Sequence, residues 1–335
     1  MVYRKFTDEE LGLIKEKLDE GMVIRDIHKQ FFSYRSLAGI KAKIKRDGLK
    51  VATPVNESGL IHKPDRLDNL LVKHDLSEDE LMKVLKTKEY IKPTNKIADI
   101  DYGSGHVKFA VISDTHIGSI YFHEKDLLQT FKKIEKEKVD FIIHPGDHVD
   151  GFYAPHRMQQ LWELEDLGYT QQMNHVLKLY KEAPNKIFGI DGNHDDTYVR
   201  LVGAIIGEEL EDKLGKDNFE HLGKGEGHIK LGDMIIQIRH PGTGSAYALS
   251  YRSQKYADSI TGGTKPNMSI TGHHHKFFYM MYRNILMLEA GTLCSQTRFQ
   301  RDKELANHKG FSFVELKYNK KGITRAKIDW IPMYE

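Results

Sequence analysis

The sequence predicts an α/β domain preceded by a small domain of three helices. Two observations lead to this fold class. Short apolar runs bounded by Gly, Pro and Asp recur from residue 106 onward, a pattern typical of buried strands. The first 50 residues instead carry apolar side chains at helical spacing between capping residues and glycines. We therefore expect a helical domain over residues 1–50, a linker with one helix over 51–105 and the α/β domain over 106–335.

The helical domain is predicted to contain three short helices. Thr7 and Glu10 form a capping box that begins the first helix, and Gly21 ends it. Residues 23–31 form the second helix, and a third helix follows and ends at Gly48. Three short helices joined by tight turns resemble a helix-turn-helix domain of the homeodomain or Myb-like kind.

The third predicted helix is strongly basic. Residues 1–50 hold twelve Lys and Arg against eight Asp and Glu, although the net charge of the whole chain is only +2. Cations on one helix face are what contacts to DNA phosphates require. A basic, solvated face on a helical interaction module is the alternative. The candidate DNA-binding residues are Arg35, Lys41, Lys43, Lys45 and Arg46.

The linker contains one capping signal. Residues 51–66 are rich in Pro, Asn, Ser and Gly, which indicates an extended connection. A second capping box begins at Ser77, and we expect its helix to continue to about Tyr90.

Five apolar runs in the α/β domain are predicted strands, at residues 107–113, 141–145, 186–190, 234–239 and 268–271. Each run ends in Asp, His or Asn. The carboxyl ends of strands are where open α/β sheets build their sites. The recurrence of these residue types at five such ends therefore predicts one site.

The residues at the strand ends form a mixed set of oxygen and nitrogen ligands. Seven donors exceed what one four-coordinate ion needs and are enough for two divalent metal ions. Imidazole combined with carboxylate suits Mn, Fe or Zn better than Ca or Mg, so we expect Mn²⁺, with Fe, Zn, Ni or Mg as alternatives. The candidate ligands are Asp114, His116, Asp147, Asn193, His240, His273 and His275.

Two of these assignments rest on simple geometry. A carboxylate offers two oxygens and is the natural bridge between two cations, and Asp147 is our choice for that role. If residues 272–275 continue as a strand, alternation places His273 and His275 on one face and His274 on the other. We therefore leave His274 out of the ligand set.

Three further residues are predicted to support catalysis. His194 follows a ligand, and a histidine beside the metals can donate a proton to the leaving oxygen. Asp195 is predicted to take part in catalysis by holding the His194 ring in the right tautomer. Asp150 is predicted to orient a ligand histidine in the same way.

The remaining elements of the domain are predicted from periodicity. Residues 124–138, 161–181 and 246–260 are expected to be helices, and residues 311–330 to be closing strands of a second sheet. The glycine-rich loop 241–247 follows His240 directly. Its amides, with Arg252 and Lys255 beyond it, could approach a phosphate, and a plain turn is the alternative.

Composition excludes several classes of protein. The single cysteine, Cys294, excludes a disulfide framework and a cysteine-rich metal site. No run approaches the roughly 18 consecutive apolar residues of a membrane span. The amino terminus has no apolar signal core. We expect a soluble, cytoplasmic protein of a phage or an archaeon, with no membrane partner and an oligomeric state that the sequence does not define.

The order of the motifs DxH, GDxxD, GNHD, H and GHxH is similar to that of the calcineurin-like metallophosphoesterase superfamily, over about residues 106–315. The resemblance implies a four-layer α/β/β/α sandwich, a dinuclear metal centre and hydrolysis of a phosphoester by a metal-bound hydroxide. It also implies a role for each motif residue. Asp114, His116 and His275 would bind the first metal, Asn193, His240 and His273 the second, with Asp147 bridging and His194 as the catalytic histidine that is not a ligand.

A finer resemblance concerns the first motif. Asp114-Thr-His-Ile-Gly118 followed by Phe122-His123 resembles the nuclease subunit of the double-strand-break repair complex, which implies that His123 supports the metal ligands. The chain departs from that family at Asp150, where archaeal members tend to have histidine, and only 60 residues follow His275. We therefore expect a nuclease-like phosphodiesterase that is not an orthologue of that subunit.

Three functions follow from these patterns. The leading hypothesis is a dinuclear-metal phosphodiesterase that cleaves DNA while the amino-terminal helices hold the duplex. The alternative is a phosphatase or nucleotide phosphodiesterase acting on small molecules or phosphoproteins, with the helices as a partner tether. A third is a binding protein with a vestigial centre, as in polymerase small subunits, and the intact motif set argues against it.

Overall fold

The chain divides into two compact units, Met1–Lys92 and Pro93–Glu335. The computed structural model describes residues 6–20, 22, 24–35, 40, 43–44, 46, 96–100, 105–152, 161–242, 244, 247–261 and 265–334.

The amino-terminal unit contains the first two predicted helices, α1 (Asp8–Asp19) and α2 (Ile24–Phe31). Thr7 and Glu10 form the predicted capping box. Residues 40, 43, 44 and 46 are also helical, while the other residues of the predicted third helix, Lys41 and Lys45 among them, lie outside the described residues. The predicted helix from Ser77 to Tyr90 lies outside them as well. A small apolar core is formed by Ile14, Leu18, Ile27, Phe32, Ile40 and Ile44.

Arg35 does not face outward as predicted. Its Nη2 lies 2.6 Å from Glu10 Oε2, and its guanidinium stacks over the Phe6 ring at 4.1 Å from the centroid. Only 11% of the Arg35 side chain is exposed. The predicted outward orientation of Arg35 is therefore wrong, because its charge is paired within the helical unit, and its role as a DNA contact stays an untested prediction. Lys43 is half-buried and Arg46 is exposed, as a phosphate contact requires.

The second unit is built on two six-stranded sheets. The first sheet has the order β12 (Gly322–Pro332), β11 (Gly310–Asn319), β2 (His106–Val111), β3 (Phe141–His144), β4 (Ile187–Asp191) and β5 (Phe219–Lys224). The second has the order β1 (Ile97–Ile100), β6 (Glu226–Leu231), β7 (Met234–Arg239), β8 (Met268–Thr271), β10 (Ile285–Ala290) and β9 (Phe277–Tyr282).

All five predicted strands are present, but they are shared between the sheets. Three of them are β2, β3 and β4 of the first sheet, and two are β7 and β8 of the second. Strand β1 was not predicted and lies inside the segment expected to be a linker. Strands β11 and β12 do not close the second sheet as predicted. They extend the first, because β11 pairs antiparallel with β2 from Ser312 opposite Val111 to Lys317 opposite His106.

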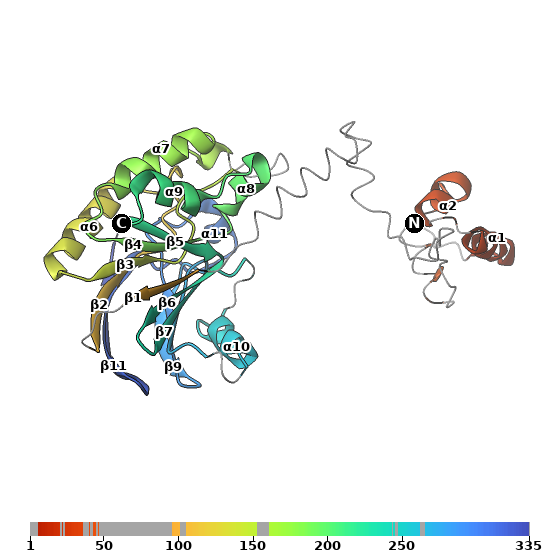
Figure 1. Cartoon of the computed structure of the whole chain (residues 1–335). Helices are drawn as coiled ribbons and strands as arrows, with labels where there is room; N and C mark the ends of the chain where they lie inside the picture. Colours follow the sequence, from red (N-terminus) through yellow and green to blue (C-terminus); the bar gives the residue numbers. More distant parts are fainter. Residues whose placement is uncertain are drawn as a thin grey trace, which may run out of the picture. The chain divides into compact units, whose positions relative to one another are not determined.

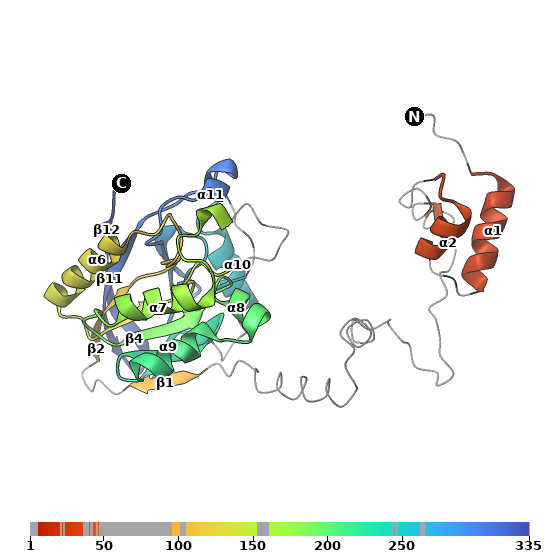
Figure 2. The same cartoon turned by 90° about the horizontal axis from the view of Figure 1, so that it is seen from above.

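Helices cover the outer face of each sheet, and the α/β sandwich fold is confirmed (Figure 1). Helices α6 (Glu124–Glu137), α7 (Tyr169–Tyr180) and α9 (Ile206–Leu214) share an apolar core with the first sheet, and Figure 2 looks onto this layer. Helix α10 (Tyr251–Ser259) packs on the outer face of the second sheet. Two short helices, α8 (Asp196–Val202) and α11 (Arg298–Asp302), lie in connections.

Two helices are shorter than predicted. The helix expected from residue 161 begins only at Tyr169, because Gly168 precedes it with a left-handed φ of 87°. The helix expected from residue 246 begins at Tyr251. In the described residues, no helix is long and apolar enough to cross a membrane.

The inner faces of the sheets meet in one apolar layer. Phe109, Ile143 and Ile190 point into it from the first sheet, and Ile236 and Ile270 from the second. Strands β2, β3 and β4 are parallel neighbours, and so are β7 and β8. Parallel strands bring their carboxyl ends to one edge of a sheet. The residues that follow these strands in both sheets can therefore converge on one site.

Candidate metal centre

The seven predicted ligands follow five strands and converge. Asp114 and His116 follow β2, Asp147 follows β3, Asn193 follows β4, His240 follows β7, and His273 and His275 follow β8. The Asp and His ligand atoms form three groups in which all atoms lie within 4.8 Å of one another. Two of them consist of predicted ligands only, and the third, His116, Asp147 and His194, joins these two.

The first group joins Asp114, His116 and His275. The Nε2 atoms of His116 and His275 lie 3.1 Å apart, and Asp114 Oδ1 lies 3.4 Å from His275 Nε2. Two nitrogens bound to one cation at about 2.1 Å would be about 3.0–3.4 Å apart, depending on the coordination geometry. The spacing therefore fits three ligands of a single divalent ion.

The second group joins Asp147, His240 and His273, with Asn193 beside them. The Asn193 Oδ1 atom lies 2.8 Å from His273 Nδ1 and 3.1 Å from His240 Nε2. These atoms are at the separations expected for ligands of one ion. The donor set is again mixed oxygen and nitrogen, which suits a transition metal.

Asp147 lies between the two groups. Its Oδ2 atom is 3.1 Å from His240 Nε2 in the second group and 3.8 Å from His116 Nε2 in the first. Its Oδ1 atom accepts a hydrogen bond of 2.9 Å from the backbone N–H of His194. A carboxylate in this position could hold two cations at once, as the sequence predicts.

The backbone at these residues is unusual. Asp114, His116, Asp147, His273 and His275 all have φ between 48° and 77°, in the left-handed region. Residues other than Gly, Asn and Asp rarely occupy this region, and such strain is found mainly at functional sites. The left-handed residues turn the chain after β2, β3 and β8, so that neighbouring side chains can point to the same site, which a regular strand or helix would not allow.

This backbone also corrects the reason for excluding His274. Residues 272–275 are not a strand, so strand alternation does not separate the three histidines. The left-handed residues at His273 and His275 have the same effect. His274 turns away from the metal groups, and its Nδ1 atom lies 2.9 Å from Glu289 Oε2.

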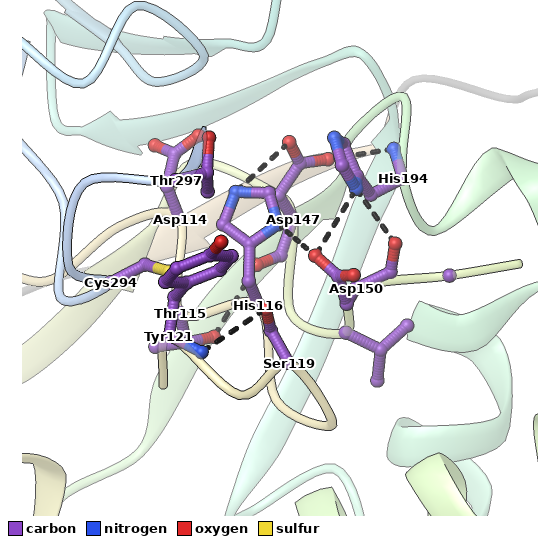
Figure 3. A network of polar contacts seen from close by, with 12 residues as sticks. Asp114, Thr115, His116, Ser119, Tyr121, Asp147, Asp150, His194, Cys294 and Thr297 are labelled. Atoms are coloured by element: carbon purple, nitrogen blue, oxygen red, sulfur yellow. Dashed lines mark hydrogen bonds and ion pairs between the residues drawn. The ribbon is translucent and has the colours of Figure 1, made fainter. Parts of the chain in front are cut away.

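The ligand histidines are oriented by atoms on their far sides. His116 Nδ1 lies 3.1 Å from Asp150 Oδ1, so Asp150 lies where the sequence predicts (Figure 3). His240 Nδ1 lies 2.7 Å from the carbonyl oxygen of Pro145. A hydrogen bond at one ring nitrogen fixes the tautomer and presents the other to the metal.

Sequence reasoning missed the partners of the last ligand. His275 Nδ1 lies 2.8 Å from Gln300 Nε2 and 3.1 Å from Asn307 Oδ1. Gln300 belongs to α11 and Asn307 to the loop that follows it. No motif marks these residues, because amides that contact a ligand from a later element have no fixed spacing from it.

His194 lies beside the two groups. Its Nδ1 atom is 2.7 Å from the carbonyl oxygen of Asp150, and its ring centroid is 4.3 Å from that of His116 (Figure 3). Burial lowers the pKa of the His194 imidazole, although the charge of Asp147 opposes the shift. The side chain is placed for the predicted proton transfer but is held by Asp150.

Asp195 does not orient the His194 ring as predicted. Its carboxylate accepts hydrogen bonds from the backbone N–H groups of Gly192 at 2.8 Å, Val149 at 3.1 Å and His148 at 3.3 Å. Burial raises the pKa of this carboxyl well above its usual range, with a further contribution from Asp191. Asp195 therefore ties together the loops after β3 and β4, and its effect on the centre is structural.

His123 does not lie among the ligands. It is the exposed residue that precedes α6, and within the described part of the chain no hydrogen bond or ion pair connects it with the metal groups. The prediction of His123 as a support for the metal ligands is therefore not met. Phe122, its neighbour in the motif, is buried in the core of the first sheet and has a packing role.

The charges of the two groups are strongly coupled. Burial alone would lower the pKa of His116 and of His240, but nearby carboxylates raise it to about 9 for His116 and about 10 for His240. The Asp150 hydrogen bond is the main cause at His116, and the Asp147 charge at His240. Protons on these imidazoles neutralise the carboxylates in the positions where divalent cations would do so. The donor set therefore fits divalent metal ions.

A cavity of about 630 Å³ opens onto these residues. Ligands from both groups line it, and so does His194. The other walls come from the loop after β7, through Gly242 and Gly244, and from α11, through Phe299 and Gln300. Both groups therefore face one space in which a substrate can contact them together.

Comparison with known proteins gives curated relatives at low identity. The DNA polymerase II small subunit of Thermoplasma acidophilum is 24% identical over 255 residues, which cover 65% of this chain and 52% of the relative. The corresponding subunit of Methanothermobacter thermautotrophicus is 24% identical over 236 residues, which cover 57% of this chain and 48% of the relative. This chain thus matches about half the length of these relatives.

Similar solved structures include an archaeal phosphodiesterase, with a TM-score of 0.40 and 15% identity, which matches 67% of this chain and 99% of that one. Vps29 from Entamoeba histolytica in complex with zinc has a TM-score of 0.34 and 14% identity, with 67% of this chain and 98% of that one matched.

The family assignment rests on the sequence. The calcineurin-like phosphoesterase family matches residues 107–277, which is half of the chain. The match begins in β2 and ends in β9, and it contains all seven predicted ligands and His194. This family binds divalent metals, and the two groups of ligand atoms are the candidate sites for them. The chain belongs to the calcineurin-like phosphoesterase family and carries a phosphoesterase domain of its metallophosphoesterase fold.

Proposed function

We propose that this domain hydrolyses phosphodiester bonds, with DNA as the substrate and two divalent metal ions, Mn²⁺ first among them, as cofactors. One observation carries the proposal. Asp147 lies between two groups of ligand atoms, and it forms a third close group with His116 and His194 on the wall of a common cavity. When bound, two such ions clamp a phosphoryl group and lower the pKa of water at the site.

The residues of the chain divide the work. Asp114, His116 and His275 would hold one ion, and His240 and His273, with Asn193, the other. Asp147 would fix the separation of the two ions because its two oxygens belong to one rigid carboxylate. Asp150 and Pro145 keep ring nitrogens pointed at the centre, so little reorganisation is needed when a substrate enters.

His194 is the candidate for proton transfer. A carbonyl oxygen can only accept, so the short contact with Asp150 O places a proton on His194 Nδ1. To donate a proton to the leaving oxygen, the ring would also have to be protonated at Nε2, and it would return to the neutral form with its proton on Nδ1 after the transfer. Asp150 thus contacts His116 through its carboxylate and His194 through its backbone, which couples the positions of the two rings.

Two observations favour DNA over a phosphoprotein or a small phosphomonoester. Both curated relatives are small subunits of a DNA polymerase, which supports a nucleic-acid context. The amino-terminal unit is basic, and we propose that Lys41, Lys43, Lys45 and Arg46 contact DNA phosphates as part of a helix-turn-helix-like module.

Hydrolysis by the purified full chain in Mn²⁺ tests this function. The substrates are labelled single- and double-stranded DNA, bis-p-nitrophenyl phosphate as a diester and p-nitrophenyl phosphate as a monoester. Asp147→Asn, purified in the same way, controls for a contaminating nuclease. Cleavage of DNA and of the diester by the natural chain, absent from Asp147→Asn, supports the proposal.

Other outcomes point elsewhere. Cleavage of the monoester alone would move the assignment to a phosphatase acting on small molecules or phosphoproteins. Metal binding without turnover of any substrate would favour a non-catalytic centre. A DNA affinity that falls with salt, and that is lost when Lys43 and Arg46 are replaced by Gln, would assign the helical unit to DNA binding.

A further inference from the structure

A second cavity lies on the outer side of the second sheet, under α10. Its volume is about 290 Å³, and its charged lining consists of Arg239, Arg252, Lys255, His274 and Glu289. Its lining includes Arg239 and Thr271, the last residues of β7 and β8, which are the strands that precede predicted metal ligands. Figure 1 shows α10 beside β7. Neither the family nor the proposed metal centre accounts for it.

Arg239 is the main feature of this cavity. It is the last residue of β7 and directly precedes His240, so alternation sends it to the opposite face of the sheet from that ligand. Its guanidinium Cζ lies 3.1 Å from the ring centroid of Tyr256 in α10. Among the residues that the structure describes, no acceptor forms a hydrogen bond or an ion pair with it.

The donors of Arg239 are available to a ligand. The half-buried guanidinium carries five N–H donors, and none of its nitrogens is among the fully buried atoms without a partner, so solvent or a ligand can reach them. Stacking on an aromatic ring satisfies the flat face but none of the in-plane donors. These donors are arranged to bind the oxygens of a phosphate or carboxylate in pairs.

His274 connects this cavity with the metal cavity, because it lines both. Its side chain is only 6% exposed, and its Nδ1 atom is bound to Glu289. Its Nε2 atom is buried and has no hydrogen-bond partner among the described residues. A polar group of a ligand that spans the two cavities would satisfy this nitrogen.

Among the described residues that line the cavity, the one acid is already engaged. Glu289 Oε1 accepts a hydrogen bond of 2.6 Å from Ser253 Oγ, and Oε2 lies 2.9 Å from His274 Nδ1. A second carboxylate, Glu226, lies opposite Arg239 in the pairing of β6 with β7 and also acts on its charge. The three cations Arg239, Arg252 and Lys255 outnumber these two carboxylates, which favours an anionic ligand.

The glycine-rich loop after His240 adds a second link. Arg252 Nε donates to the carbonyl oxygen of Gly244 at 3.3 Å, and Gly244 lines the metal cavity. Gly244 has a φ of +81°, and a β-carbon there would collide with the Arg252 guanidinium. Glycine at this position thus lets Arg252 approach the loop between the two cavities.

We propose that this cavity is a phosphate subsite that binds a backbone phosphate of the nucleic-acid strand next to the one being cleaved. Arg239 and Arg252 hold the phosphate oxygens, and His274 lies on the path between the subsite and the metals. This inference rests on the proposed function, because it assumes a substrate with more than one phosphate. It predicts that a strand of several nucleotides binds better than an isolated diester.

Direct binding to the metal-free full chain tests the subsite apart from catalysis. The probe is a 5′-phosphorylated thymidine dinucleotide, titrated by isothermal calorimetry in EDTA. The variants are Arg239→Met, which keeps the length of the side chain, and Arg252→Gln. We expect the dissociation constant to rise at least about tenfold in each, the usual loss for a charge-assisted hydrogen bond. Lys230→Gln is the matched control, since Lys230 lies on β6 in an ion pair with Asp99 and lines neither cavity.

A second readout uses the ratio of substrates. In Mn²⁺, the kcat/KM for a trinucleotide divided by that for bis-p-nitrophenyl phosphate should fall about tenfold in Arg252→Gln and stay constant in Lys230→Gln. Circular dichroism checks that each variant folds. If Arg239→Met does not fold, Arg252→Gln alone tests the subsite, because it changes a partly exposed side chain.

The outcomes separate this inference from the proposed function. If the natural chain does not bind the dinucleotide, or binds it equally well in both arginine variants, the subsite is wrong even if DNA is cleaved. If binding depends on the arginines but no DNA is cleaved, the subsite stands and the nuclease assignment fails. If Lys230→Gln loses as much affinity for the dinucleotide as the arginine variants, the loss reflects the net charge of the chain, and the subsite is overturned.

Discussion

Buried charge is used in opposite ways in the two units of this protein. In the helical unit, the Glu10 carboxylate accepts from Arg35 Nη2 at 2.6 Å, Arg35 Nε at 3.0 Å and Tyr34 Oη at 2.8 Å. In the phosphoesterase unit, Asp147 lies among imidazoles that must hold protons to balance it. The first cluster is complete by itself, and the second requires cations to complete it.

The backbone follows the same division. Glu10 lies in the first turn of α1, in regular helical geometry that a capping box supports. Asp147 has a left-handed φ of 56°, as do four other ligands with comparable angles. The Glu10 cluster, which stabilises the fold, lies on regular helical backbone. The Asp147 cluster, which is arranged for a ligand, lies on backbone in the left-handed region.

The largest effect on activity is expected from Asp147→Asn, which changes the carboxylate between the two predicted metal groups. An amide is neutral and offers one oxygen, so it cannot bridge two cations. Asparagine tolerates the left-handed backbone, so the fold should remain. We expect hydrolysis of bis-p-nitrophenyl phosphate to fall by about 10³-fold or more, or about 4 kcal/mol of activation free energy. Initial rates and bound manganese measured by mass spectrometry check this, and full activity with two ions bound would contradict the bridging role.

His194→Ala separates chemistry from metal binding. The imidazole is held by Asp150 O beside the ligands but belongs to neither group that holds an ion in our assignment. Loss of a positioned proton donor costs about 10²–10⁴-fold in kcat. We expect that decrease with the metal content unchanged. A variant that lost its metals together with its activity would show that His194 is a ligand.

Asp150→Asn should have an intermediate effect. The variant replaces a carboxylate that orients His116 Nδ1 but leaves the ligands themselves in place. Loss of such a partner typically costs about 10–100-fold in metal affinity or activity. Titration of the metal-free chain with Mn²⁺ measures the shift. Asp126→Asn, which removes an ion pair with Lys309 away from the centre, is the control and should bind the metal normally.

The smallest effect is expected from Glu10→Gln. Its partners hold the pKa of Glu10 at about 2, and the hydrogen bonds from Arg35 are the main cause. A lowered folded pKa gives stability that is present above the ordinary value of 4.5 and is lost as the pH falls toward 2. Glu10→Gln should lower the free energy of unfolding of the helical unit by about 1 kcal/mol and remove this pH dependence of its stability.

Hydrogen exchange of the helical unit at pH 6 and pH 3 measures the effect of Glu10→Gln. The natural chain should lose protection between these values, and the variant should show less change. Its phosphodiester hydrolysis at neutral pH should equal that of the natural chain. A loss of hydrolysis in this variant would mean that the clamp in the helical unit influences the metal centre.

The sequence predicted which residues converge on one site, because strand ends carry them; that they bind metal stays a prediction. Each of the five apolar runs became a strand, and the residue types at their ends have few structural uses together. The division of the strands between two sheets could not be predicted from periodicity. A buried strand such as β7 has the same apolar pattern in either sheet. Strands β11 and β12 were predicted in the second sheet but belong to the first.

Partners of the ligands were harder to predict. Asp195 follows His194 in the sequence, and proximity suggested a pair, but backbone amides bind its carboxylate instead. Pro145 supplies a carbonyl oxygen, for which no residue type is diagnostic. Arg239 looked like any strand residue, and only the structure shows that it stacks on Tyr256 and that none of the described residues forms a hydrogen bond or an ion pair with it.

The five left-handed ligands also carry information about evolution. A histidine in that conformation costs about 1 kcal/mol, whereas glycine has no such penalty and asparagine or aspartate a small one. Selection for the fold alone would therefore let His116, His273 and His275 drift toward Gly or Asn with a gain in stability, and would not hold Asp114 and Asp147 against Asn. A homologue that has drifted in this way has kept the architecture and given up the metals. One that keeps Asp and His at all five positions is still under selection for what those side chains bind.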